Sequence, residues 1–223
     1  MEDTVSFSLL ELFKMGGVFM WPLLAFSVAT ISIGVERAVY FIYHSVRIDD
    51  LGAKVSELLA GGDYKGAADY LSAQTKRRMG ARVLLALVNR AAPADGAPTS
   101  GRPFSEHHTE RAVETAAASS INSMENGFNF LTALGSLSPL TGFLGTVSGM
   151  IGAFKSIAEA TEVNAQIVAN GIYEALITTV FGLIIAIIAM IFHSIFSHIV
   201  DKFAAEIEKV CSDLIAEVSD RQS

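Results

Sequence analysis

The sequence contains a single cysteine, Cys211, among its 223 residues. One cysteine cannot form a disulfide within the chain, which excludes a disulfide-stapled fold and multi-cysteine metal sites. The sequence also lacks a phosphate-binding glycine loop, and it lacks a motif that pairs a nucleophilic residue with a general base. His107 and His108 lie beside Glu106 and Glu110. Because adjacent histidines point to different faces of a helix, a solvated helix is the simpler interpretation there. We therefore expect that the protein is not an enzyme and that it binds no cofactor and no metal ion.

Charge is scarce over long stretches of the chain. Only 17% of the residues are charged, 51% are hydrophobic, and residues 15–35, 126–154 and 175–200 contain no Asp, Glu, Lys or Arg. At about 1.5 Å per helical residue, each stretch can cross about 30 Å of hydrocarbon. The net charge of −7 argues against a nucleic-acid partner. The long uncharged stretches indicate that membrane lipid surrounds much of the chain. The sequence predicts an all-α integral membrane protein with three transmembrane helices and long helical cytoplasmic extensions.

The basic residues predict the orientation. Residues 37–125 hold 11 of the 16 Lys and Arg, so the positive-inside rule places this region in the cytoplasm and the amino terminus outside. The carboxyl terminus is then cytoplasmic. The predicted segments are an outer amphipathic helix (1–14), a first transmembrane helix (15–36), a cytoplasmic helical loop (37–125), a second transmembrane helix (126–155), an outer connection (156–171), a third transmembrane helix (172–200) and a cytoplasmic tail helix (201–223).

Local signals divide the cytoplasmic loop further. Residues 51–91 read as two or three helices with a turn at 61–63, and residues 92–103 form a Pro/Gly/Ser-rich linker. Ser105 is placed to cap a helix that continues through Glu125 toward the second span without an obvious breaker. The tail has an apolar residue every three or four positions, which predicts a helix that needs a partner surface. These residues are Ile199, Phe203, Ile207, Val210, Leu214 and Val218.

Small residues recur at helical spacing in the second and third spans. One interpretation is helix packing alone, with each threonine hydroxyl bonded to a carbonyl one turn back. The other is a smooth wall facing a pore or a sliding helix, on which a lone hydroxyl offers the polar contact. The positions are Gly135, Pro139, Gly142, Thr146, Gly149 and Ala153 in the second span, and Ala175, Thr179, Gly182, Ala186, Ala189 and His193 in the third.

Two stretches resemble signatures of the ExbB/TolQ/MotA family. Residues 138–150, Ser-Pro-Leu-Thr-Gly-Phe-Leu-Gly-Thr-Val-Ser-Gly-Met, followed by Ala153-Phe154, resemble the second-span signature. Residues 171–183, Gly-Ile-Tyr-Glu-Ala-Leu-Ile-Thr-Thr-Val-Phe-Gly-Leu, resemble the third-span signature of ExbB and TolQ in particular. MotA is the poorer match, because that branch has four spans. Trp21-Pro22, Glu36-Arg37 and Gly62-Asp63-Tyr64 also fit, whereas Ser148, Ile188 and His193 depart from the common pattern.

The resemblance implies a subunit of an ion-driven motor in the bacterial inner membrane. In the family, a homo-oligomeric ring, a pentamer, encloses a single-span partner like ExbD or TolR and acts on an envelope protein like TonB or TolA. By this resemblance Thr146 and Thr179 match pore-facing threonines and Glu174 a third-span glutamate. Helical spacing also selects Thr179 over Thr178, about 100° away around the helix. Glu174 instead fits a helix-terminal role equally well.

The sequence leaves two questions open, namely which ion is translocated and whether any ion is translocated at all. The translocated ion can be a proton or sodium, since a hydroxyl-bearing wall suits either. The chain can also be a structural membrane scaffold that translocates no ion.

Overall fold

The computed structural model describes residues 9–44, 46–92, 105–159 and 165–222, and the regular secondary structure in these ranges is helical throughout. Three of the helices, α2, α7 and α8, are long and apolar enough to cross a membrane. The predicted all-α class with three candidate spans is therefore confirmed. In chain order the helices are α1 (Leu9–Met15), α2 (Met20–Tyr43), α3 (Asp49–Ala60), α4 (Tyr64–Gln74), α5 (Met79–Ala91), α6 (Glu106–Met124), α7 (Phe128–Glu159) and α8 (Ala165–Gln222).

Contacts between Cα atoms divide the chain into two compact units. The apolar unit comprises Met1–Glu36 and Gly127–Ser194, and the polar unit comprises Arg37–Asn126 and Ile195–Ser223. Helices α2 and α8 contribute residues to both units.

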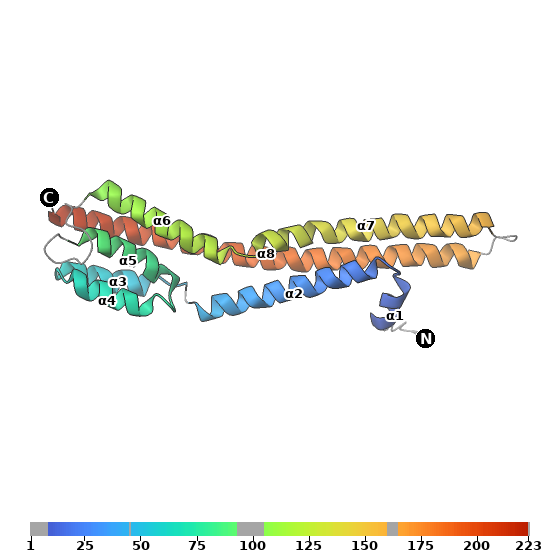
Figure 1. The fold of residues 1–223 in the computed structure, drawn as a ribbon, viewed down its shortest axis with the longest axis horizontal. Helices are drawn as coiled ribbons and strands as arrows, with labels where there is room; N and C mark the ends of the chain where they lie inside the picture. The colour runs from blue at the N-terminus through green and yellow to red at the C-terminus, as the bar shows by residue number, and fades with distance from the viewer. Residues whose placement is uncertain (1–8, 45, 93–104, 160–164, 223) are drawn as a thin grey trace, which may run out of the picture. The chain divides into compact units, whose positions relative to one another are not determined.

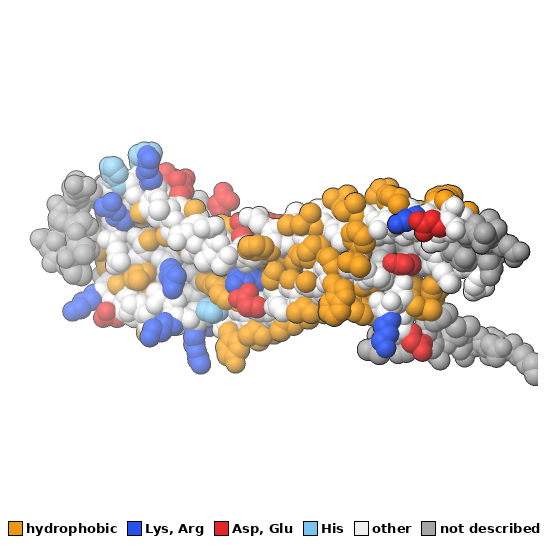
Figure 2. Space-filling view, turned by 45° about the vertical axis from the view of Figure 1, so that its right-hand side comes forward, with side chains coloured by type: hydrophobic (Ala, Val, Ile, Leu, Met, Phe, Trp, Pro, Cys, Tyr) orange, Lys and Arg blue, Asp and Glu red, His pale blue; other side chains and the backbone are white. Residues whose placement is uncertain are grey.

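The apolar unit packs α2 and α7 along the first part of α8 (Figure 1). Large hydrophobic side chains remain exposed on all three helices, and hydrophobic side chains cover much of the visible face of this unit (Figure 2). Phe130, Phe143 and Ile151 of α7 are each more than 60% exposed. Because exposed apolar surface in water costs about 25 cal/mol per Å², an apolar face of this extent fits lipid or a partner subunit rather than solvent.

The first candidate span begins later than the charge pattern predicted. Residues 15–36 were expected to form one helix, but α1 ends at Met15, a turn follows, and α2 begins at Met20. Gly17 in this turn has φ +66°, a conformation that side chains disfavour. Pro22 then lies in the first turn of α2, where a missing N–H costs little. At its other end α2 continues to Tyr43.

The helix expected to run from Ser105 into the second span is interrupted, so that prediction was wrong. Helix α6 ends at Met124, Gly127 has φ +90°, and α7 begins at Phe128. Gly127 adopts the left-handed conformation without strain, which lets the chain leave one helix and start the next. Ser105 does precede α6, but its side chain makes no capping hydrogen bond.

The polar unit contains the end of α2, the three short helices α3, α4 and α5, helix α6 and the end of α8. The predicted turn at 61–63 is present, and the Asp63 carboxylate caps α4 by accepting a hydrogen bond from the Gly66 N–H at 2.8 Å. Helices α3 and α8 are joined by a 2.8 Å hydrogen bond from the Ser56 hydroxyl to Glu217.

Arg37 near the end of α2 is buried in this unit. Its guanidinium donates to the Ser123 carbonyl oxygen of α6 at 3.4 Å and stacks on the Tyr40 ring.

The apolar stripe predicted in the tail lies in the core of this unit. Phe203, Ile207, Leu214 and Val218 are all at most 3% exposed, whereas Ile199 and Val210 are half-buried. Val210 lies against Gly52 of α3, so loop helices of the same chain provide one partner surface for the stripe. The linker at 92–103 lies outside the described residues except for residue 92, as do 160–164 of the predicted connection at 156–171.

Candidate functional site

Helices α7 and α8 meet along a seam of small residues within the apolar unit. A Cβ atom added to Gly142 would lie 2.8 Å from the Thr178 carbonyl oxygen and 3.1 Å from the Thr179 Cα. A Cβ atom on Gly182 would lie 2.5 Å from the Ser138 carbonyl oxygen. These distances are too short for any side chain, so the two backbones touch directly. This close approach is the way helices in lipid gain packing energy.

Two adjacent threonines bring hydroxyl groups to the middle of the seam. The Thr179 hydroxyl crosses from α8 to the Gly142 carbonyl oxygen on α7, 3.3 Å away. The Thr178 hydroxyl lies 2.8 Å from the Ala175 carbonyl oxygen and 3.2 Å from that of Gly142. A hydroxyl has one proton, so the shorter distance favours donation from Thr178 to its own helix. Thr179 is then the donor that links the two helices.

Thr146, the second predicted pathway threonine, makes a different bond. Its hydroxyl donates to the Phe143 carbonyl oxygen of the same helix at 2.6 Å, and the residue is half-buried. This bond matches the packing interpretation, in which a hydroxyl is satisfied one turn back. Thr146 and Thr179 therefore have separate partners in the single chain.

The buried seam is rotated slightly from the predicted small-residue stripes. The structure buries four of the predicted positions on α8, namely Ala175, Gly182, Ala186 and Ala189. It differs from the spacing at two others, since Thr179 and His193 are only half-buried. Thr178, which the spacing did not select, is 1% exposed. On α7 the spacing missed two buried members. These are Ser138, which is fully buried, and Gly145, against which the Thr178 side chain packs.

Gly149 and Ala153 extend the seam toward the start of α8. A Cβ atom on Gly149 would lie 3.0 Å from the Gly171 carbonyl oxygen, and the buried Ala153 packs against Gly171. Gly135 is less crowded, since its nearest neighbour across the seam is the Met190 side chain at 3.6 Å. Pro139, inside α7, has no N–H to donate to the Gly135 carbonyl oxygen one turn back. A carbonyl oxygen at the less crowded end of the seam thus loses its usual helix donor.

Glu174 lies one helical turn before Thr178 on α8, but its carboxylate contacts another element. A side chain on Gly17 would collide with its carboxylate, so this group rests against the turn between α1 and α2. Glu174 is half-buried and lies one residue before the buried Ala175. The structure thus brings Thr178, Thr179 and Gly142 together and sets Glu174 beside Gly17.

Charged side chains are absent from the middle of the seam, and the acidic residue Glu174 lies within α8, one turn before Thr178. Residues 126–154 and 175–200 contain no Asp, Glu, Lys or Arg, and His193 near the end of the apolar unit packs edge-on to Phe128, with ring centroids 5.7 Å apart. Among the described residues, no three His, Cys, Asp or Glu side chains gather closely enough to hold a metal ion. The middle of the seam offers hydroxyl and carbonyl oxygens but no carboxylate.

The fold and the seam together define an all-helical membrane protein with three candidate spans, two of which touch through glycine and hydroxyl-bearing residues. Residues 77–209 match the MotA/TolQ/ExbB proton channel family, and the chain belongs to this family.

Three relatives indicate how far the similarity extends. The putative biopolymer transport protein ExbB-like 3 of Synechocystis sp. is 31% identical over 184 residues, which cover 81% of each chain. The biopolymer transport protein ExbB of Pseudomonas putida is 33% identical over 107 residues, 48% of this chain and 32% of the relative. The Tol-Pal system protein TolQ of Haemophilus influenzae is 44% identical over 82 residues, 37% of this chain and 36% of the relative. The matches thus span about a third of the two latter proteins.

Proposed function

We propose that this chain is the channel-forming subunit of an ion-driven motor in a bacterial inner membrane. The motor converts the proton gradient, or a sodium gradient, into mechanical work on an envelope-spanning partner. Family membership supports this function, as do relatives named for biopolymer transport and for the Tol-Pal system. The amino terminus is then outside and the carboxyl terminus in the cytoplasm.

The observation on which the proposal rests is a polar seam without an acid. Ion translocation through a membrane needs a group that binds and releases the ion within the hydrocarbon. Here the middle of the apolar unit supplies the Thr178 and Thr179 hydroxyls and the Gly142 carbonyl oxygen, but no carboxylate. The titrating group therefore comes from another polypeptide. An aspartate on the single span of a partner like ExbD or TolR fits this requirement.

In the assembly, identical subunits form a ring, a pentamer as in the family, around the partner's span. Thr146 and Thr179 face the partner's aspartate in successive subunits, and Glu174 lies at the outer end of the pathway. The Thr179 hydroxyl can leave the Gly142 carbonyl oxygen for an incoming carboxyl group, because a bond at 3.3 Å is near the long limit for hydrogen bonds.

The energy available is sufficient for mechanical output. One elementary charge that crosses about 100 mV releases about 2.3 kcal/mol, so several ions can drive rotation of the partner within the ring. A rotating partner then pulls on or reorients an envelope protein of the TonB or TolA type.

The test replaces Thr179 in the full-length protein co-expressed with its single-span partner. Thr179→Val keeps the side-chain shape and removes the hydroxyl, whereas Thr179→Ser keeps the hydroxyl. Gradient-driven ion flux into proteoliposomes should fall at least roughly tenfold in the valine variant and return in the serine variant. Equal flux in all three proteins would contradict the pathway role of Thr179.

The same proteoliposomes separate the motor from a structural scaffold. With wild-type protein and partner, collapse of the gradient by an ionophore should abolish the response of the envelope protein. A scaffold would give the same output with and without a gradient.

A further inference from the structure

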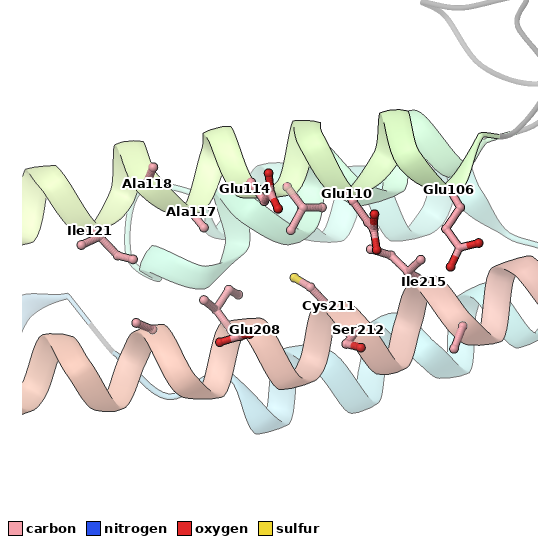
Figure 3. Close-up of a pocket in the computed structure, with 14 residues that line it drawn as sticks. Glu106, Glu110, Glu114, Ala117, Ala118, Ile121, Glu208, Cys211, Ser212 and Ile215 are labelled. Carbon is pink, nitrogen blue, oxygen red and sulfur yellow. The ribbon is translucent and has the colours of Figure 1, made fainter.

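We propose that the groove between α6 and α8 of the polar unit binds helix α5 of a second copy of this chain. The inference rests on the proposed ring and names the cytoplasmic surfaces through which neighbouring subunits meet. The groove has a volume of about 590 Å³, and α6 and α8 face each other across it (Figure 3). Its floor is apolar and includes Val113, Ala117, Ile121, Ile207 and Ile215.

The rim of the groove is acidic. Glu106, Glu110 and Glu114 follow one another at steps of four on α6, and Glu208 lies on α8. All four residues are exposed, no Lys, Arg or His is among the groove's lining residues, and none of the four forms an ion pair with another described residue. Like charges at this spacing repel one another, so a cationic surface is the favoured occupant.

Helix α5 presents such a surface on the same chain. Its outward positions carry Arg82, Leu85, Ala86, Asn89 and Arg90, which are exposed or half-buried, while the opposite side fills the core of the unit. Arginine covers apolar surface with its stem and pairs with carboxylates through its guanidinium. A stripe of two arginines around a small apolar centre therefore matches an apolar floor with an acidic rim.

The spacing and direction of the two surfaces agree. Arg82 and Arg90 are eight residues apart, as are Glu106 and Glu114, so each pair spans about 12 Å along its helix. Within one copy α5 and α6 lie side by side and run in opposite directions (Figure 1). Rotation about an axis parallel to these helices keeps heights and directions unchanged. With this equal spacing, a neighbour's Arg90 can pair with Glu106 while its Arg82 pairs with Glu114.

The contact is between different surfaces, and this has a consequence for assembly. Each copy offers one acidic groove and one basic α5 face, so copies join head to tail. Head-to-tail contacts between identical subunits produce a closed ring when the rotation per subunit closes. The same geometry is what the proposed motor requires around a central partner.

Charge reversal in the full-length protein tests the contact. Glu114→Arg and Arg82→Glu should each raise the protein concentration at half-assembly in detergent at least roughly tenfold, measured by light scattering. The double variant E114R/R82E should recover most of the loss. Asp69→Arg on α4 and Arg111→Glu on α6 are matched controls, because both residues are exposed and lie outside the groove. Circular dichroism reports whether each variant keeps its helices.

Cross-linking provides a second measurement that does not depend on charge. In a Cys211→Ala background, Leu85→Cys on one tagged copy and Ser212→Cys on another should be joined by a short bis-maleimide, giving a dimer on a denaturing gel. Leu85→Cys with Thr115→Cys, which lies outside the groove, should not be joined. The contact is contradicted if the wild-type protein forms a ring and neither charge reversal changes its assembly. It is also contradicted if the groove cysteine is cross-linked only to a foreign protein. Both outcomes leave the proposed motor function unaffected. A wild-type monomer overturns the ring itself.

Discussion

The Thr179 hydroxyl reaches the Gly142 carbonyl oxygen across the seam between α8 and α7, at 3.3 Å, because Gly142 has no side chain to hold the helices apart. The hydrogen bond from Thr179 and the close approach of the two helices depend on each other. A larger residue at 142 would separate the helices and remove the acceptor from the reach of Thr179. The stability of the apolar unit and the position of its hydroxyl groups should therefore respond together to changes at this glycine.

We predict opposite effects for two glycine-to-alanine changes on α7. Gly142→Ala places a Cβ atom 2.8 Å from the Thr178 carbonyl oxygen and should destabilise the protein by about 1–3 kcal/mol. Gly152→Ala meets no atom within 4 Å and should stabilise the helix by about 0.5–1 kcal/mol. Thermal unfolding in detergent measures both. Equal shifts for the two variants would mean that the seam is not closely packed.

A second prediction separates Thr178 from Thr179. Thr178 is buried and its hydroxyl bonds within α8, so Thr178→Val should lower the free energy of unfolding by about 0.5–1.5 kcal/mol. Thr178→Ser keeps the hydroxyl and serves as its control. Ion flux per folded complex should change less in Thr178→Val than in Thr179→Val. The reverse order would assign the pathway to Thr178.

The turn after α3 provides a matched pair of glycines. Gly62 has φ +75° with no atom within 4 Å of an added Cβ, so Gly62→Ala should cost about 1–2 kcal/mol through backbone strain alone. Gly61 has φ −78° and ordinary contacts, the nearest at 3.5 Å, so Gly61→Ala should be close to neutral. Chemical unfolding followed by circular dichroism compares them. A loss at Gly61 as large as that at Gly62 would point to lost packing instead.

Burial raises the pKa of the Cys211 thiol from 9.0 to about 12. Between these values the unfolded chain releases the thiol proton and the folded chain keeps it. The free energy of unfolding should therefore fall as the pH rises from about 9 toward 12, by about 1.4 kcal/mol per unit. Cys211→Ala should remove this part of the dependence, as unfolding midpoints at pH 8 and pH 10 would report.

The same thiol should react slowly with iodoacetamide at pH 9. Only the thiolate reacts, and at this pH the raised pKa lowers its population by a factor of about 500 relative to an unshifted thiol. Fast labelling of the folded protein, followed by mass spectrometry, would contradict the burial of Cys211.

The sequence predicted those parts of the fold that depend on length and charge. Three uncharged stretches were enough to identify three candidate spans. The interruptions at Gly17 and Gly127 were missed because a glycine inside an apolar run is compatible with a helix until the positive φ is known. The turn at Gly62 was found because Gly-Gly-Asp combines glycine with a helix-capping carboxylate.

The buried face of the seam was predictable to within one residue. Helical spacing selected Thr179 and Thr146, but steps of three and four both fit a period of 3.6, and the structure instead buries Thr178 and Gly145. The choice depends on where the partner helix lies. Ala175, Thr178 and Gly182 share the spacing that would have revealed the buried threonine. The placement of Glu174 against Gly17 joins residues far apart in sequence, and no local pattern predicts such a contact.

The seam also has a genetic consequence. Every missense change in a glycine codon adds at least one heavy atom, and at Gly142 and Gly182 that atom would meet backbone of the facing helix. Backbone cannot swing aside as a flexible side chain can. In a saturation mutagenesis library selected for function, these two codons should therefore accept almost nothing but synonymous changes.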